Sequence, residues 1–458
     1  MQSIFAQTAY SSDEFWLPYN QVCLSVLCEG SLIEITEEGP KQSYYILNEN
    51  SLLKLNKNSV LVEEMAVVKW KKISRFVECI ESYCFGFKLV GKSTHRTFYV
   101  ENQYELDKWV LNLSFVGIME NISADYFFVE ELGKGSFSRV FLAVENTSQK
   151  KFAIKCIQKK DLLRRKNGLS HIINEIEIVR KLDHPNIIKL HKVYEDIDYV
   201  YLVLDYIEGK DLHKRLQTKN YSEEAAFFFV QKLLKTVDYL SSHNIIHRDI
   251  KPENLILESM DNDIEFKLAD FGLAIEGSKN IEGKCGSLGF VAPEILKEQK
   301  YSSNVDVFSC GIVYYTLIAG HTPFKGKNHK EIYFNNAKCN INFKEKCWAK
   351  ISIAVIDTIQ VMTKADPHLR PSAKKVLRNN LFKTVTNSQE SIDDSLNNER
   401  AQENLGENKW ILEKMAERNY QYMYNQDQIY LMHYLSVMFI WNTYWLYRNQ
   451  YLNNFYPI

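Results

Sequence analysis

The chain has 458 residues, of which 25% are charged, and its formal net charge is −1 at pH 7. This length is enough for two or three domains, and the near balance of charges argues against a chain built to coat nucleic acid or an acidic membrane. The nine cysteines include no C-x-x-C pair, so the sequence indicates neither a zinc site nor a disulfide framework. We therefore expect free thiols in a reducing cytoplasm, and no secretory signal is visible at the N-terminus.

Residues 22–118 follow a short N-terminal segment, residues 1–21, and alternate between strand-like runs and turn-like clusters. Apolar residues at every second position indicate short β-strands that each bury one face. Clear examples are Ser31–Ile35, Tyr44–Leu47 and Thr97–Val100. The pattern predicts a small, strand-rich domain.

A helix is expected at the end of this strand-rich stretch. Asn102 is a suitable N-cap, and apolar residues then recur at i, i+3, i+4 and i+7 on one face. These residues are Leu106, Trp109, Val110 and Leu113. A meander of strands closed by one C-terminal helix that carries a Trp resembles a pleckstrin-homology (PH) domain. The resemblance covers about residues 22–116 and implies a β-barrel capped by the helix.

The resemblance does not extend to a phosphoinositide site. PH domains that bind phosphoinositides place several Lys and Arg on the first two strands and the loop between them, to pair with phosphate oxygens. This chain has Glu34, Glu37 and Glu38 there, with only Lys41 on the basic side. One basic cluster is expected on a solvated face: Lys69, Lys71, Lys72 and Arg75. We favour a module that docks a protein partner or makes an autoinhibitory contact, with headgroup binding as the alternative.

A glycine-rich turn opens residues 126–382. It runs from Gly133 to Val140 and follows a strand-like run. Glycines let a backbone hairpin approach phosphates closely and aim amide N–H groups at them. Lys155 lies on the next strand-like run. The turn therefore indicates a phosphate-binding loop.

The most specific pattern begins at His247, where His-Arg-Asp-Ile-Lys-Pro-Glu-Asn is followed, about twenty residues later, by Asp-Phe-Gly. Phosphoryl transfer to a hydroxyl needs one carboxylate that orients the hydroxyl and accepts its proton. Asp249 is the candidate for this base, and Lys251 can stabilise the charge on the moving phosphoryl group. Oxygen ligands must also hold Mg²⁺ on the phosphates, and Asn254 and Asp270 are the candidates.

This spaced set resembles the eukaryotic protein kinases. The resemblance implies, for residues 126–382, a bilobal fold with a β-rich N-terminal lobe and an α-helical C-terminal lobe, and it implies ATP and Mg²⁺ as cofactors. Lys155 would hold the α- and β-phosphates and pair with a glutamate of the helix that precedes His184-Pro185-Asn186. Glu175 and Glu177 both qualify chemically but point about 200° apart on a helix. Alignment to the family motif selects Glu175.

The resemblance also assigns residues around the nucleotide. Backbone groups of Asp205 and Ile207 would bond the adenine, and Ser138 replaces the third glycine of the family's loop. Asp211 and Glu253 match positions that receive an arginine of the substrate, which favours basic substrates. The residues expected at the nucleotide are Leu132, Gly133, Lys134, Gly135, Ser136, Phe137, Ser138, Arg139, Val140, Ala153, Lys155, Asp205, Ile207, Asp211, Glu253, Asn254, Ile256 and Asp270.

The activation segment departs from the family in one respect. Ser287 places a hydroxyl where Ser/Thr kinases carry threonine, which favours Ser/Thr over Tyr as acceptor. In the family, the arginine at the position of Arg248 usually binds a phosphate on this segment. The family's phosphoacceptor position is Gly283 here, with Glu282 beside it. We expect that phosphorylation at that position is not needed and that Glu282 supplies part of the charge, with Ser278 as the other hydroxyl of the loop.

Two further contacts are expected in the C-terminal lobe. Glu294 should form a buried ion pair with Arg370, and Asp306 should hold the backbone of the catalytic loop. The wording of the surrounding motifs most resembles the calcium/calmodulin-dependent kinase group.

The C-terminal tail is divided into two parts. Residues 383–408 are rich in polar residues and are expected to form a linker, and residues 409–458 an aromatic-rich helical tail. Acidic residues offset the basic ones in residues 409–424, so a calmodulin-target helix is only weakly indicated. Residues 429–447 contain no charged side chain, and their length suits a membrane span. Their polar and Tyr content favours a helix docked on protein, with a C-terminal membrane anchor as the alternative.

The sequence therefore predicts an α+β multidomain protein: a PH-like module, a bilobal kinase domain and a helical tail. Its predicted function is transfer of the ATP γ-phosphate to Ser or Thr of protein substrates that carry basic residues upstream. The alternative is a catalytically inactive pseudokinase that serves as a scaffold or adaptor. The predicted location is cytoplasmic, with a peripheral membrane location as the alternative, and no nucleic-acid partner is expected.

Overall fold

The computed structural model describes residues 3–7, 16–18, 26–36, 38–55, 62–80, 83–91, 94–135, 138–165, 167–277, 280–379 and 382. The expected linker and helical tail lie outside these ranges, and so do the calmodulin-target helix and the membrane anchor considered there. Among the helices of the described ranges, none has both the length and the apolar character to cross a membrane.

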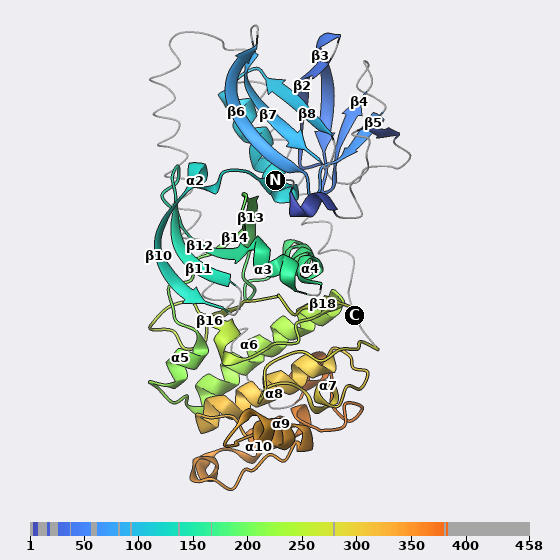
Figure 1. The fold of residues 1–458 in the computed structure, drawn as a ribbon. Coiled ribbons are helices and arrows are strands. Elements are labelled where there is room, and N and C mark those ends of the chain that lie inside the picture. The colour runs from blue at the N-terminus through green and yellow to red at the C-terminus, as the bar shows by residue number, and fades with distance from the viewer. Residues whose placement is uncertain are drawn as a thin grey trace, which may run out of the picture. The chain divides into compact units, whose positions relative to one another are not determined.

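The N-terminal module, residues 3–119 of the described ranges, is built mainly of antiparallel strands (Figure 1). They hydrogen-bond in the order β1-β5-β4-β3-β2-β8-β7-β6. Their bounds are β1 (Leu17–Pro18), β2 (Cys28–Thr36), β3 (Gly39–Leu47), β4 (Ser51–Leu55), β5 (Val62–Val67), β6 (Lys72–Ile80), β7 (Tyr83–Val90) and β8 (His95–Val100), after a short 3₁₀ turn, η1 (Ile4–Gln7). The strand-rich meander is confirmed, but a closed barrel is not. In the described residues β5 and β6 do not pair, and the sheet stays open and continues from β6 into β9 (Ile118–Met119).

The helix expected after the meander is α1 (Gln103–Val116). Asn102 caps it, and its side chain accepts a hydrogen bond from the backbone N–H of Glu105 at 3.0 Å. The predicted apolar face is buried, with Trp109 fully so. Trp109 stacks on Phe87 of β7, so the helix covers the inner side of the strands. Sequence periodicity was sufficient here because the apolar residues of α1 lie on one face, and that face packs on the sheet.

Charged residues of the N-terminal module are more buried, and form more ion pairs, than the sequence indicated. Glu34 is only 3% exposed and pairs with Arg96 at 3.0 Å, so it belongs to the interior and not to a surface that could repel a phosphate. The expectation of a solvated basic face is wrong for Lys69, Lys71 and Lys72, which are half-buried, whereas Arg75 is exposed. Lys72 pairs with Glu120 at 2.7 Å, Arg75 pairs with Asp125, and Lys69 pairs with a glutamate of the next domain. These side chains are occupied by acidic partners.

Residues 126–382 begin with an antiparallel five-stranded part of the same sheet, in the order β13-β14-β12-β11-β10. Its strands are β10 (Tyr126–Lys134), β11 (Ser138–Glu145), β12 (Lys151–Gln158), β13 (Leu190–Glu195) and β14 (Tyr199–Asp205). The helices that accompany it are α2 (Ile122–Asp125), α3 (Lys159–Arg164) and α4 (Gly168–Lys181). β13 pairs in parallel with β9, which joins this lobe to the N-terminal module.

The rest of the domain is helical, which confirms the expected order of a β-rich lobe and then an α-helical lobe. Its helices are α5 (Leu212–Leu216), α6 (Glu223–Ser242), α7 (Pro293–Leu296), α8 (Asn304–Ala319), α9 (His329–Lys338), α10 (Ile353–Met362) and α11 (Ala373–Leu377). Short elements complete it: β15 (Ile245–Ile246), β16 (Leu255–Leu257), β17 (Phe266–Leu268), β18 (Ile275–Glu276), η2 (Pro252–Asn254) and η3 (Lys346–Lys350). α6 and α8 pack side by side (Figure 1). α8 is apolar on every side and buried from Val305 to Ile318, so it forms the centre of this lobe.

One cysteine departs from the expectation of free thiols. Cys84 in β7 is disulfide-bonded, whereas the six other cysteines whose side chains the structure describes are free. Spacing along the chain could not reveal this bond, because a disulfide depends on how closely two Cα atoms approach in the fold.

Candidate active site

The loop between β15 and β16 is fixed by a carboxylate from α8. Asp306, in the first turn of that helix and 1% exposed, accepts hydrogen bonds from the backbone N–H groups of His247 at 2.7 Å and Arg248 at 2.9 Å. Arg248 has φ 67°, a left-handed conformation that is costly for a residue with a side chain. The two bonds to Asp306 hold the backbone in that conformation.

Asp249 lies at the centre of a small polar cluster. Its Oδ1 accepts a hydrogen bond from the hydroxyl of Ser287 at 2.7 Å, and its Oδ2 lies 2.8 Å from the Nζ of Lys251. The amide of Asn254 donates to the backbone carbonyl of Asp249 at 2.8 Å and to Oδ2 at 3.1 Å. Lys251 also donates to the Ser287 hydroxyl at 2.7 Å. Both carboxylate oxygens therefore have a fixed direction before a substrate hydroxyl arrives.

A second cluster forms around Lys155 of β12. Its Nζ lies 2.7 Å from Oε1 of Glu175 in α4 and 2.9 Å from Oδ1 of Asp270. Of the two glutamates that qualified by sequence, Glu175 makes this pair, while Glu177 lies on another side of α4 against Lys69. Asp270 has φ 59°, so it is the second left-handed residue with a side chain in the site.

The electrostatics of this second cluster favour the charged forms of Lys155 and Asp270. The ammonium of Lys155 holds the pKa of Asp270 well below its usual range. Burial works to lower the pKa of Lys155, but the carboxylates of Glu175 and Asp270 outweigh it and raise that pKa. Burial raises the pKa of Glu175, against the effect of Lys155. The side chain of Asp270 is 52% exposed, so its carboxylate can also reach a ligand.

The glycine-rich turn joins β10 to β11, and Gly135 donates its backbone N–H to the carbonyl of Ser138 at 2.8 Å. Ser136 and Phe137, expected at the nucleotide, lie outside the described residues. Val140 is the register partner of Lys155, and Ala153 lies two residues before it on β12. Side chains two residues apart on a strand share a face. These three residues therefore line the same side of the sheet.

Arg139 is not placed with them. It is the register partner of Cys156, so its side chain lies on the opposite face, where it pairs with Glu131 and stacks over Phe141 at 4.9 Å. A cavity of about 400 Å³ occupies this opposite face and is also lined by Lys134. The side chain of Arg139 therefore lies on the face opposite Lys155, away from the other residues that the sequence placed at the nucleotide.

The hinge residues lie at the end of β14. The Asp205 carboxylate bonds to His191 at 2.7 Å and accepts from the backbone N–H of Lys189 at 3.1 Å, while the backbone N–H of Asp205 donates to the carbonyl of Lys189 at 3.2 Å. Asp211 caps α5 and forms a backbone bridge with Ile256. The remaining residues expected at the nucleotide are half-buried or exposed: Leu132, Gly133, Ile207 and Glu253.

Arg248 has a partner that the sequence did not indicate. Its Nη1 donates to the hydroxyl of Tyr301 at 2.8 Å and its Nε to the carbonyl of Leu273 at 2.7 Å. The Tyr301 hydroxyl in turn donates to the carbonyl of Gly283 at 3.3 Å. The expectation that Glu282 supplies charge to Arg248 is wrong, because Glu282 is exposed and lies 3.4 Å from Lys300. The sequence indicated only that Arg248 needs a hydrogen-bond acceptor. No local motif identifies Tyr301 as that acceptor.

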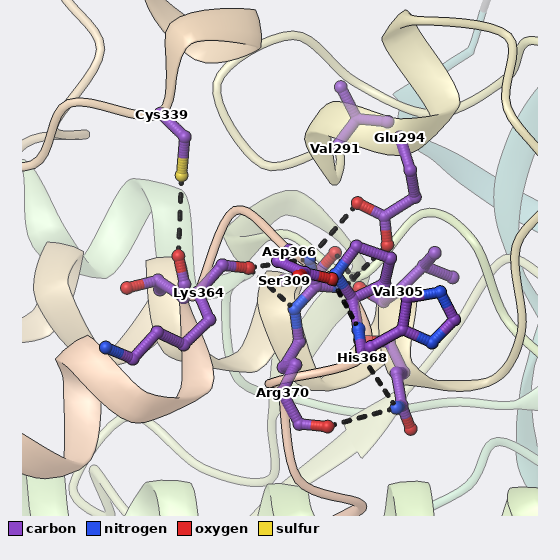
Figure 2. A network of polar contacts seen from close by, with 12 residues as sticks. Val291, Glu294, Val305, Ser309, Cys339, Lys364, Asp366, His368 and Arg370 are labelled. Atoms are coloured by element: carbon purple, nitrogen blue, oxygen red, sulfur yellow. Dashed lines mark hydrogen bonds and ion pairs between the residues drawn. The ribbon is translucent and has the colours of Figure 1, made fainter.

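The expected pair of Glu294 with Arg370 is confirmed (Figure 2). Arg370 donates to both carboxylate oxygens of Glu294, at 2.7 and 3.1 Å, and both side chains are at most 1% exposed. Further donors of the guanidinium bind the carbonyls of Asn304 and Lys364. This network fixes the start of α8, and with it Asp306, beneath the catalytic loop.

The donor set fits a hard cation held together with phosphates. Asp270 offers an accessible carboxylate, and the amide of Asn254 lies on the same loop as Asp249. Groups of three or more His, Cys, Asp or Glu that could hold a metal by themselves are absent from the described residues. A Mg²⁺ ion bound by Asn254 and Asp270 would complete its shell with phosphate and water oxygens, as it does in phosphoryl-transfer enzymes.

Comparison with known proteins gives consistent matches. A family model described as "Protein kinase domain" matches residues 126–382. Calcium/calmodulin-dependent protein kinase type 1 of Macrobrachium nipponense is 34% identical over 297 residues, which cover 64% of this chain and 85% of that protein. Myosin light chain kinase A of Dictyostelium discoideum is 36% identical over 278 residues, 60% of this chain and 93% of the relative. The human calcium/calmodulin-dependent protein kinase type 1B is 36% identical over 261 residues, 57% and 75% of the two chains.

Proposed function

The chain belongs to the protein kinase family, and on that premise we propose that it transfers the γ-phosphate of ATP to serine or threonine hydroxyls of proteins. The observation that carries the proposal is a pair of polar clusters, one in which Asn254 and Lys251 hold Asp249 and one in which Glu175 and Asp270 hold Lys155. Asp249 orients the acceptor hydroxyl and accepts its proton, while Lys251 stabilises the charge on the transferred group. Bound Mg²⁺, held by Asn254 and Asp270, would neutralise phosphate charge during the transfer.

Hydroxyl specificity and substrate charge are also part of the proposal. Ser287 binds both Asp249 and Lys251, so the activation segment is tied to the residues that meet the acceptor. Asp211, at the N-cap of α5, and the exposed Glu253, in η2, are the acidic side chains that we propose to meet the substrate. Acidic groups there favour a substrate with basic residues through charge complementarity. A serine peptide with upstream arginines is therefore the proposed model substrate.

The decisive experiment is a transfer assay with the full-length chain, radiolabelled ATP, Mg²⁺ and a serine peptide with arginines upstream of the acceptor. We expect phosphate on the serine, and more slowly on a matched threonine peptide. A tyrosine peptide of the same sequence should stay unlabelled. Absence of transfer to a broad peptide panel would favour the pseudokinase scaffold instead.

Activation without a phosphate on the segment is the second part of the proposal. Tyr301 supplies the acceptor that Arg248 needs, and it ties the arginine to the carbonyl of Gly283. Tyr301→Phe should lower kcat/KM about fivefold, because loss of one hydrogen bond to a charged group costs about 1 kcal/mol or more. Phosphatase treatment of the wild-type chain should leave its activity unchanged.

A matched substitution for this prediction is Tyr315→Phe. The Tyr315 hydroxyl also donates to a backbone carbonyl, that of Asn342 at 3.0 Å, but it has no contact with the catalytic loop. It should keep wild-type kcat/KM. Loss of activity on phosphatase treatment, with a phosphate mapped to Ser278, would contradict the role assigned to Tyr301.

The strand order and the capping helix with Trp109 support a PH-like assignment of the N-terminal module. We propose a role in docking or regulation for it. Lys69, Lys72 and Arg75 are occupied by acidic residues of the chain itself, which disfavours a phosphoinositide site on that surface. Calmodulin appears in the names of two of the relatives, and calmodulin binding by this chain is a proposal that depends on its tail.

A further inference from the structure

Helix α4 has a second set of partners besides the catalytic site. Lys69 of the N-terminal module lies 2.7 Å from Oε1 of Glu177. Arg180 donates from Nη1 to the carbonyl of Val116 at 2.7 Å and from Nη2 to the carbonyl of Gly117 at 2.8 Å. We call these bonds the docking contact. It joins α4 to two separate segments of the module, the turn before β6 and the end of α1.

The docking contact takes Arg180 out of water. The guanidinium lies over the ring of Trp70 at 5.6 Å, and desolvation lowers the pKa of Arg180 to about 10 although Glu177 opposes this shift. A charged group loses free energy when it leaves water, unless hydrogen bonds and opposite charge replace the lost hydration. Two carbonyls and one carboxylate supply that replacement here. Such a contact indicates a built interface and not a chance surface encounter.

An apolar cluster surrounds the docking contact. Phe5, Trp70 and Ile118 of the N-terminal module are at most 3% exposed, and they pack in one cluster with Ile172 and Ile176 of α4. The rings of Phe5 and Trp70 stack at 5.2 Å with an interplanar angle of 11°. Burial of large aromatic side chains stabilises such an interface. The module and α4 therefore share a core.

The N-terminal turn adds a third anchor. The backbone N–H of Ile4 donates to Oε1 of Glu195 at 2.8 Å, and this buried carboxylate also pairs with Lys159 at 2.6 Å. Glu195 ends β13, the strand next to β9. The module thus holds both the sheet and the helix of the N-terminal lobe.

The opposite anchor of α4 is catalytic. Glu175 lies between the residues of the apolar cluster on the same helix and reaches Lys155, and Asn174 donates to the carbonyl of Ala274 at 2.7 Å. Helices at an interface can shift or rotate by small amounts when one set of contacts is lost. A rotation of α4 would withdraw Glu175 from Lys155, and Lys155 must be in place for phosphoryl transfer.

We propose that the N-terminal module holds α4 in its catalytic position, with Glu177 and Arg180 as positioning residues, so that the docked module activates the enzyme. The inference rests on the proposed kinase function. The docked module would raise the activity, whereas the autoinhibitory contact suggested from the sequence would lower it. Whatever detaches the module from α4, such as a protein partner that competes for the docking contact, would lower the activity.

A charge swap in the full-length chain tests this inference. Lys69→Glu and Glu177→Lys should each lower kcat/KM for ATP about tenfold, because each places two like charges at the docking contact. The double variant restores an ion pair and should return to within about threefold of wild type. Amide hydrogen exchange in α4 should be faster in the single variants and recover in the double variant. The KM for the peptide should not change.

The matched control is the pair of Lys232 and Glu265, which lie 2.5 Å apart at 34% and 35% exposure, away from α4. Reversal of either charge there should leave kcat/KM and α4 exchange unchanged. If Lys69→Glu fails to fold, Arg180→Lys replaces it as the test. This variant keeps the charge but not both carbonyl bonds, and it should give a smaller loss of kcat/KM and a smaller increase of exchange in α4.

The outcomes separate this inference from the kinase function. Wild-type activity in Lys69→Glu, with or without faster exchange in α4, overturns the positioning role and leaves the kinase function intact. Higher activity in the single variants would show an inhibitory module and also overturn it. An inactive wild-type chain would instead refute the proposed function on which the inference rests.

Discussion

Replacement of Asp270 by Asn is expected to lower kcat by about 10³-fold in a domain that still folds. Asp270 is the accessible carboxylate beside Lys155, and its charge must hold both the lysine and the metal on the phosphates. The amide is similar in size but neutral, so it binds a hard cation more weakly. Lys155 keeps Glu175 as its partner, so the lobe should still fold. The measurement is kcat for the serine peptide at saturating ATP and Mg²⁺, with thermal unfolding in parallel.

The deficit of Asp270→Asn should not depend on pH near neutrality. Lys155 depresses the pKa of Asp270 in the folded protein, so the carboxylate is ionised at any pH above its ordinary range of about 4. Stabilisation from such a group is present above the unfolded pKa and is lost only as the pH falls through the lower folded pKa. Asp261→Asn, in an exposed turn, is the matched control and should retain full activity. An Asp270→Asn variant within about threefold of wild type would remove Asp270 from the metal site.

Arg370→Met is expected to lower the free energy of unfolding by about 3–5 kcal/mol. Methionine fills most of the volume, but the carboxylate of Glu294 would stay buried without a counter-charge, and the carbonyls of Asn304 and Lys364 would lose a donor (Figure 2). The guanidinium also lies over the ring of Phe308 at 5.0 Å. Denaturant unfolding followed by far-UV circular dichroism measures the loss.

Two further variants separate the cause of that loss. Glu294→Leu combined with Arg370→Met should recover part of the stability, because replacing a whole buried pair by apolar groups costs less than leaving one charge alone. Arg164→Met removes an arginine whose side chain is 76% exposed and 4.0 Å from Asp161, so it should change the stability by less than about 1 kcal/mol. A loss below about 1 kcal/mol in Arg370→Met would contradict the structural role of the pair.

Sequence patterns predicted those parts of the fold that are determined by residues within a short segment or within a family motif. The face of α1 with Trp109 was visible in the spacing of apolar residues, and Asn102 was visible as its cap. The pair of Glu294 with Arg370 followed from family motifs, because each residue occupies a fixed place in a motif. Periodicity was enough for α1, whereas the contact of Glu294 with Arg370, between residues 76 apart, could be predicted only from the motifs.

Other contacts between distant segments, which belong to no family motif, could not be predicted in this way. The basic cluster around Lys69 looked solvated because its acidic partners are far along the chain, and Arg180 showed no sign that it would meet the carbonyls at the end of α1. Tyr301 was missed as the partner of Arg248 for the same reason. The open sheet also depends on β9, two residues that no periodicity could identify as a strand.

The pairing of β9 with both β6 and β13 has a practical consequence for anyone who expresses this protein in pieces. Residues 3–382 of the described ranges fall in one compact unit, whereas the family match begins at residue 126. A fragment cut there would lose Ile118 and uncover the apolar side of α4, and it would leave β13 as an unpaired edge. Exposed edges and apolar patches recruit other chains, so the fragment would be prone to aggregate. The sequence-family boundary is therefore the wrong place to cut a soluble catalytic fragment.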